Sequence, residues 1–196
     1  MVDLAYEALV RDERLRLGPG GAFFQHNSNL VPGLLQIEAY AQALFRVIDP
    51  DMDPDEATDR WRVRSGRAVI FDAGASFTIL ISETALRQPA GTSQVMSDQL
   101  SHILELIESK PNLVIRVIPL SAGIYPGCDG PYVLIDFQDG GEGLYREDSV
   151  GGRYEDDAEL VARYRSIFAR ALEYALTRVQ TRELIGRIRT EWLVQT

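Results

Sequence analysis

The segment from Asn29 to Ala41 constrains the fold more than any other part of the sequence. Asn29 can cap a helix, and Pro32 suits a first helical turn, because the N–H that proline lacks would have no partner there. An apolar stripe at helical spacing follows, which indicates one buried face. The stripe consists of Leu34, Ile37, Ala41, Leu44, Phe45 and Ile48. The pattern predicts a helix from about Pro32 to Val47 that packs against a core.

The composition is that of a globular domain. A chain of 196 residues with 45% hydrophobic residues can bury one core. Its net charge of −9 argues against a general surface for nucleic acid or anionic membranes. No apolar run reaches about 18 residues, and the first residues lack the features of a signal peptide. The single cysteine, Cys128, excludes an internal disulfide. We therefore expect a cytoplasmic protein that binds neither DNA nor membrane directly.

Helical and strand patterns are segregated along the chain. The apolar spacing predicts helices over residues 3–17, 54–70, 93–109, 155–177 and 179–193. It predicts strands over residues 77–81, 113–118, 132–137 and 143–147, with a short turn or helix at 83–87. The last two strands are joined by Asp139-Gly140-Gly141, a hairpin turn signal. We expect an α+β fold, in which a small, mainly antiparallel sheet packs with several helices and the C-terminus is helical.

Glycine and proline at residues 18–21 mark the one clear break in this pattern. We expect residues 1–23 to form an N-terminal helix and a Gly/Pro linker. Residues 24–196 are expected to form a single α+β domain.

The common catalytic constellations are absent from the sequence. His26 and His102 are the only histidines, and neither belongs to a metal-binding spacing such as HExxH. The sequence has no G-x-S-x-G nucleophile elbow and no G-x-G-x-x-G after a strand. Cys128 lies in a Gly-Cys-Asp-Gly segment typical of a loop. We expect no metal and no cofactor, and we assign no catalytic residue.

Two groups of polar residues near predicted strands could line a pocket. Glu83 and Arg87 follow the strand at 77–81, where polar groups can face a ligand; an internal Glu–Arg pair that holds a turn is the alternative. Tyr132, Tyr145 and Glu147 lie on the predicted hairpin. Tyrosine combines an apolar ring with a polar tip, which suits both the edge of a core and a binding site.

A third group lies in the opening segment itself. Gln36 and Tyr40 flank the apolar stripe and could contact a ligand or another element. Buried hydrogen bonding is the alternative, because buried polar side chains are nearly always paired.

The wording of the opening segment is more specific than its pattern. Val-Pro-Gly-Leu-Leu-Gln followed by Glu-x-Tyr-Ala resembles the start of an uncharacterised domain that follows Xre-type helix-turn-helix modules in many actinobacterial (Streptomyces-type) regulators. The resemblance covers about residues 24–193. Further matches are Glu83-x-Ala85-Leu86-Arg87, Gln99-Leu100, Ile115-x-Val117-Ile118-Pro119, Gly123, Gly130-Pro131-Tyr132, Tyr145-x-Glu147, Ala175-Leu176 and Leu184-Ile185. Ile37 and Ser65 depart from residues common in the family.

The resemblance implies a regulatory domain that senses a small molecule or a partner protein. Only about 23 residues precede it, too few for a helix-turn-helix module. We therefore expect either a standalone member or a chain whose first module was removed, and DNA binding is not carried over. A homodimer is among the states open to it.

An enzyme is the main alternative. A standalone copy could have been recruited to act on a small molecule, for instance in natural-product biosynthesis, because a binding pocket needs few changes to position a reaction. Glu83, Arg87, Tyr132, Tyr145 and Glu147 would then be the first residues to substitute. A third alternative is a module whose acidic surface binds a basic partner protein.

Overall fold

The computed structural model describes residues 17–138, 140–148 and 151–194. The helix predicted over residues 3–17 lies outside this range except for Leu17, and so does Asp139 of the predicted hairpin turn. The elements, in chain order, are β1 (Ala22–Asn27), η1 (Gly33–Leu35), α2 (Glu38–Ile48), α3 (Pro54–Ser65), η2 (Gly66–Asp72), β2 (Ser76–Ser82), α4 (Glu83–Arg87), α5 (Ser93–Ser109), β3 (Leu113–Ile118), η3 (Leu120–Ala122), β4 (Tyr132–Asp136), β5 (Glu142–Asp148), β6 (Gly151–Glu155), α6 (Ala158–Tyr174) and α7 (Arg178–Val194).

The described strands form one sheet in the order β3-β2-β1-β4-β5-β6. β1, β2 and β3 are parallel, whereas β4, β5 and β6 form an antiparallel meander that joins the free side of β1. The end of β3 and the start of β4 therefore lie at the same end of the sheet, and the chain between them passes the ends of β2 and β1. This mixed sheet with its helices confirms the predicted α+β class.

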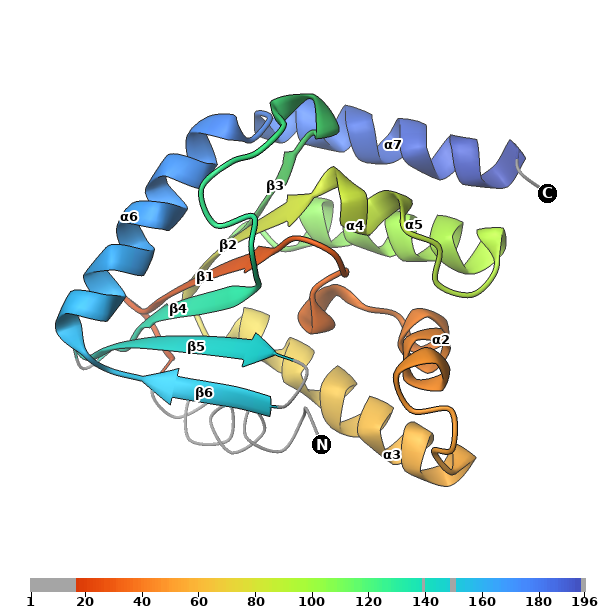
Figure 1. Cartoon of the computed structure of the whole chain (residues 1–196), viewed down its shortest axis with the longest axis horizontal. Coiled ribbons are helices and arrows are strands. Elements are labelled where there is room, and N and C mark those ends of the chain that lie inside the picture. The colour runs from red at the N-terminus through yellow and green to blue at the C-terminus, as the bar shows by residue number, and fades with distance from the viewer. Residues whose placement is uncertain (1–16, 139, 149–150, 195–196) are drawn as a thin grey trace.

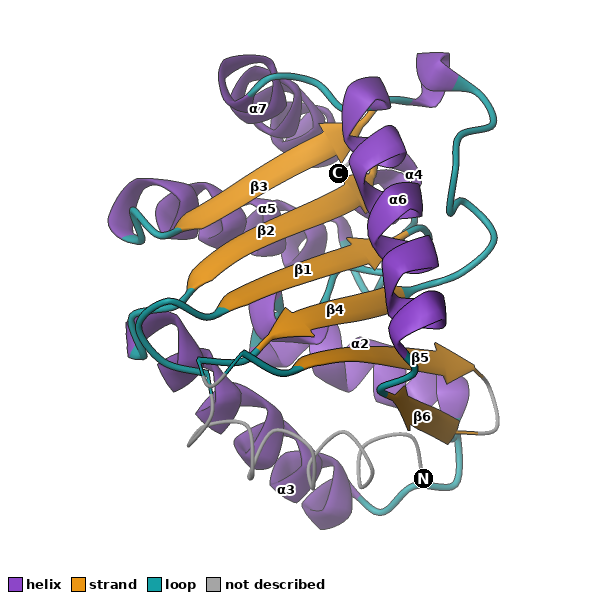
Figure 2. Cartoon of the chain, turned by 90° about the vertical axis from the view of Figure 1, so that its left-hand side faces the viewer, coloured by secondary structure: helices purple, strands orange, loops and turns teal. Residues whose placement is uncertain are grey.

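Helices cover the two faces of the sheet unequally. Of the described helices, α6 alone crosses one face, whereas α5, α7, α2 and α3 lie on the other side (Figures 1 and 2). None of the described helices is both long and apolar enough to cross a lipid bilayer.

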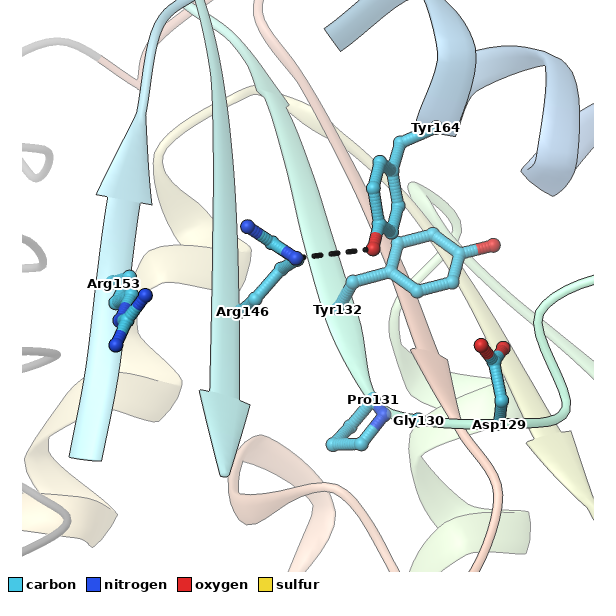
Figure 3. A pocket seen from close by; sticks show the side chains of 7 residues that line it. All are labelled: Asp129, Gly130, Pro131, Tyr132, Arg146, Arg153 and Tyr164. Carbon is cyan, nitrogen blue, oxygen red and sulfur yellow. Dashed lines mark hydrogen bonds between the residues drawn. The ribbon is translucent and has the colours of Figure 1, made fainter. Parts of the chain in front are cut away.

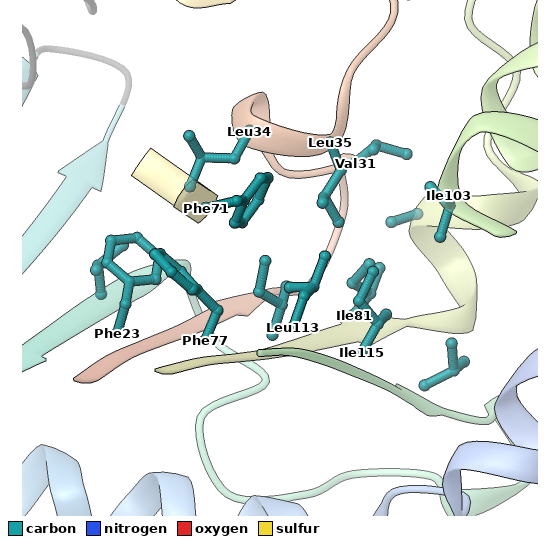
Figure 4. Close-up of a cluster of buried hydrophobic side chains, with 14 of the residues drawn as sticks. Phe23, Val31, Leu34, Leu35, Phe71, Phe77, Ile81, Ile103, Leu113 and Ile115 are labelled. Carbon is teal, nitrogen blue, oxygen red and sulfur yellow. The ribbon is translucent and has the colours of Figure 1, made fainter. Parts of the chain in front are cut away.

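The larger core lies on the face opposite α6. Alternate residues of the central strands point into it, among them Phe23, Phe77 and Ile81, all nearly inaccessible to solvent (Figure 4). The intervening residues of the same strands, such as Leu80 and Leu134, form a second core with α6. Successive residues of a central strand therefore belong to the two cores in alternation.

The predicted helix from Pro32 to Val47 is wrong at its start. The chain makes the short turn η1, becomes extended at Gln36, and only then enters α2. Gln99 of α5 causes the break, because its amide donates to the carbonyl of Leu35 (2.6 Å) and accepts from the N–H of Ile37 (2.9 Å). These tertiary hydrogen bonds outweigh local helix propensity.

Two strands, β1 and β6, had not been predicted. β1 ends in the polar residues Gln25, His26 and Asn27, which hide its strand pattern, although His26 is fully buried. β6 begins with two glycines, which disfavour a strand. A side chain at Gly152 would overlap the ring of Tyr145, which extends from β5 over this glycine. The absence of a side chain there lets the tyrosine pack.

We predict that Gln99→Leu lowers the free energy of unfolding by about 2–4 kcal/mol, because it leaves two buried backbone groups without partners. Urea unfolding of the purified protein measures this change. Gln94→Leu is the matched control, since Gln94 is exposed on the same helix and bonds only Asp98. Equal midpoints for Gln99→Leu and the wild type would show that the Gln99 contacts do not hold the loop.

Candidate functional site

A transverse row of polar and aromatic side chains crosses four strands on the α6 face. Strand register places His26 of β1 opposite Tyr132 of β4, Tyr132 opposite Arg146 of β5, and Arg146 opposite Arg153 of β6. Register partners in a sheet share a face, with their Cβ atoms about 4.5–5.5 Å apart. The row therefore runs from a buried histidine to an exposed arginine.

A pocket of about 310 Å³ lies over the outer part of this row (Figure 3). Tyr132, Arg146 and Arg153 line it from the sheet, and Tyr164 lines it from α6. The loop before β4 contributes the remaining wall, which consists of Asp129, Gly130 and Pro131. The pocket thus lies where a sheet, a helix and a loop meet.

α6 is fixed in place at its middle and just beyond its end. At its middle, Arg165 forms ion pairs with Asp136 of β4 and with Glu142 of β5, the latter at 2.8 Å. Beyond its end, Arg116 of β3 donates to the carbonyl of Ala175 at 2.7 Å. These contacts hold Tyr164 over the pocket.

The two arginines of the pocket differ in their partners. Arg146 donates from Nε and Nη2 to one carboxylate oxygen of Glu155, at 2.9 and 2.6 Å, and from Nη1 to the hydroxyl of Tyr164 at 3.5 Å. The hydrogen bond to Glu155 raises the pKa of Arg146. Arg153 has no hydrogen bond or ion pair to any described residue, although it faces Arg146 directly across the strands. Like charges in directly opposed positions destabilise a sheet, so the pair favours an added anion.

Tyr132 forms the inner wall of the pocket. Its side chain is almost fully buried, and its ring stacks on His26 with the centroids 5.2 Å apart and meets Tyr164 edge-on at 5.0 Å. Its hydroxyl has no hydrogen-bond partner in the described part of the chain, and burial raises its pKa. Gly127, at φ 85°, lies over this hydroxyl, and a Cβ there would come within 3.2 Å of it.

His26 joins the row to the loop that walls the pocket. Its Nδ1 lies 3.2 Å from the carbonyl oxygen of Gly130, and its Nε2 lies 3.1 Å from the hydroxyl of Tyr125. Because a carbonyl only accepts, Nδ1 carries the proton and donates to Gly130, so Tyr125 donates to Nε2. Burial lowers the pKa of His26 to about 4, which keeps the ring neutral near pH 7. Both nitrogens are thus occupied in holding the loop.

Of the residues singled out from the sequence, only Tyr132 lines this pocket. Tyr145 follows Leu144 on β5 and points to the opposite face, where it packs in the larger core. The backbone of Glu147 pairs with Gly152, and its side chain lies outside the described part of the structure.

Glu83 and Arg87 lie together but away from the pocket. The buried carboxylate of Glu83 accepts from Arg87 Nε at 2.7 Å and from the backbone N–H of Leu120 at 2.9 Å. Arg87 also donates to Glu191 of α7 at 2.5 Å. These contacts fasten α4 to α7 and to the chain after β3, as expected of an internal ion pair.

Gln36 and Tyr40 are buried in the loop that follows β1. The amide of Gln36 donates to the carbonyl of Val31 at 2.7 Å and accepts from Arg64 of α3 at 2.6 Å. The hydroxyl of Tyr40 accepts from the N–H of Val31 at 3.2 Å, and burial raises its pKa. The described contacts of both side chains are internal to the protein.

Four charged or aromatic residues of the pocket are not among the predicted candidates. Arg146 follows Tyr145 on the predicted hairpin, and strand alternation places the two on opposite faces. Arg153 lies on β6, which the sequence pattern does not predict, and Tyr164 lies on α6, whose position over the sheet no local pattern gives. Asp129 belongs to the Gly-Cys-Asp-Gly segment, which the pattern assigns to a loop.

Metal-binding side chains do not converge within the described residues. No group of three or more His, Cys, Asp or Glu could hold an ion there. Cys128 is exposed in the loop before β4.

The structure thus defines an α+β domain with a polar, aromatic-lined pocket beside a four-strand row. Residues 22–187 match the family described as "Domain of unknown function (DUF5753)", and the chain belongs to this family. No curated protein and no solved structure matches the chain.

His26 should make stability depend on pH. Because its pKa falls from 6.5 to about 4 on folding, the unfolded chain binds the proton more tightly, and stability present above about pH 6.5 is lost as the pH falls toward 4. Between about pH 7 and about pH 4.5 the loss due to this residue is roughly 2 kcal/mol.

Urea unfolding of the wild type and of His26→Gln at the two pH values measures this loss. The variant should lack it, because glutamine does not titrate. His102→Gln is the comparison. Burial also lowers the pKa of His102, but this residue is only half-buried on α5, so the variant should keep most of the loss. If His26→Gln shows the same pH dependence as the wild type, the buried imidazole is not its source.

Proposed function

We propose that this domain is a regulatory module that binds a small molecule in the pocket between β4, β5, β6 and α6. The observation that carries the proposal is that Arg146 and Arg153 lie directly opposite each other on neighbouring strands of the pocket wall. Arginine presents a planar array of donors suited to carboxylate and phosphate groups. An arginine that faces a second one and has no anionic partner among the described residues is therefore better explained by a ligand than by folding.

The contacts of the remaining residues favour binding over turnover. Both ring nitrogens of His26 are engaged by Gly130 and Tyr125, and the ring of Tyr132 stacks on the imidazole. The described residues that line the pocket include no serine, cysteine or histidine. We infer recognition by fixed charges and aromatic rings, with an enzyme of small molecules as the alternative that the experiment below tests.

The resemblance to domains that follow Xre-type helix-turn-helix modules in actinobacterial regulators supports a signalling role. In such an arrangement the ligand state of this domain would be passed to a DNA-binding module. The net charge of −9 agrees with DNA contact made elsewhere. A role of this kind places the protein in the cytoplasm.

The proposal is tested by mixing the purified protein with a small-molecule extract of its source organism, removing unbound material, and identifying what is retained by mass spectrometry. We expect a metabolite to be retained unchanged, up to one equivalent per chain. Arg153→Gln should reduce retention about tenfold or more, since a hydrogen bond to a charged group contributes about 1.5–3 kcal/mol.

Arg163→Gln is the matched control, because Arg163 is exposed on α6 and lines no part of the pocket. It should retain the metabolite as the wild type does. Consumption of a metabolite far beyond the molar amount of protein would establish an enzyme instead. Equal retention by Arg153→Gln and the wild type would show that the ligand binds elsewhere.

A further inference from the structure

The pocket has charge of opposite sign at its two ends. Figure 3 shows Arg146 and Arg153 on one side, Asp129 on the other, and the rings of Tyr132 and Tyr164 between them. Asp129 has no hydrogen bond or ion pair to any described residue. Its negative charge acts on the inner wall. It opposes the lowering of the His26 pKa by burial, and it adds to the raising of the Tyr132 pKa by burial.

Elsewhere on the same face of the sheet, oppositely charged side chains form ion pairs. Arg165 of α6 reaches Asp136 and Glu142, and Arg146 reaches Glu155. Asp129 and Arg153 form no such pair, although both line one pocket. The rings of Tyr132 and Tyr164 lie between them, and both charged residues are exposed (Figure 3).

We propose that the ligand is a small zwitterion, whose carboxylate or phosphate lies against Arg153 and Arg146 and whose protonated amine lies against Asp129. This inference rests on the proposed function, because it requires that the pocket bind a small molecule. Arg146 keeps donor capacity at Nη1 beyond its bonds to Glu155. The face of Tyr164 can also attract an ammonium group.

Ligands of a single charge fit this arrangement less well. A simple anion gains the arginines but leaves Asp129 unpaired and close by, and a simple amine is repelled by the two arginines. The small size of the pocket increases this selectivity, because a molecule that fills it contacts both the arginines and Asp129. The separation of the charges sets the length of the ligand, which the experiment determines.

Calorimetric titration with matched probes tests the inference. The zwitterions are 4-aminobutanoate, 5-aminopentanoate, 6-aminohexanoate and O-phosphoethanolamine, which distinguish the carboxylate from the phosphate and vary the length. Each is compared with the same molecule lacking the amine and with the same molecule lacking the acid group. We expect one zwitterion to bind about tenfold or more tightly than both of its single-charge counterparts.

Two variants assign the two ends. Asp129→Asn should remove the preference for the amine while keeping the preference for the acid, and Arg153→Gln should do the reverse. Asp51→Asn, in the exposed loop between α2 and α3, and Arg163→Gln on α6 are the charge-matched controls and should keep both preferences.

The zwitterion inference is overturned if the single-charge probes bind as tightly as the zwitterions, or if no zwitterion binds. It is also overturned if Asp129→Asn leaves the preference for the amine intact. In each of these cases the small-molecule pocket would still be supported if the wild type retains a metabolite from the extract and Arg153→Gln does not. Failure of both experiments would remove the proposed function as well.

Discussion

The position of β1 between strands of opposite direction is the constraint on which the rest of the structure depends. β1 is parallel to β2 and antiparallel to β4, so the end of β1 lies beside the start of β4. The chain that leaves β3 passes the ends of β2 and β1 to reach β4, and its last part forms the loop wall of the pocket. Buried hydrogen bonds from His26 then fix that loop. Topology supplies the wall, and one neutral imidazole positions it.

The helices and strands with clear periodicity could be predicted from the sequence. The helix at 93–109 and the strand at 113–118 have the predicted bounds, because their apolar residues recur at the period of their own structure. The start of α2 could not be predicted in this way. It is set by Gln99, which lies 62 positions along the chain from Ile37 and meets it only in the folded protein. Local patterns carry no information on such contacts.

The site was harder to predict than the fold for a related reason. Tyr132 could be singled out because it lies on a predicted strand and combines an apolar ring with a polar tip. Arg146 and Arg153 acquire their meaning only from the register between β5 and β6. Tyr164 enters through the position of α6 over the sheet. A constellation drawn from three strands, a helix and a loop leaves no spacing that a single sequence reveals.

The residues of the opening segment illustrate how a distinctive motif can serve the fold. Gln36 and Tyr40 both bond the backbone of Val31, and Gln36 also receives Arg64 from α3. These contacts shape the turn after β1 and tie the α2–α3 pair to it. A folding role accounts for the described contacts of both side chains.

Arg153 lies on a strand with a second physical property. In the part of the chain that the structure describes, β6 is the last strand of the sheet, so one row of its backbone groups faces outward. Charged side chains on such an edge hinder the addition of a strand from another molecule. The arginine that gives the pocket its charge therefore also helps to keep the sheet edge from aggregating. A substitution at this position has to remain polar if the protein is to stay dispersed while its binding is altered.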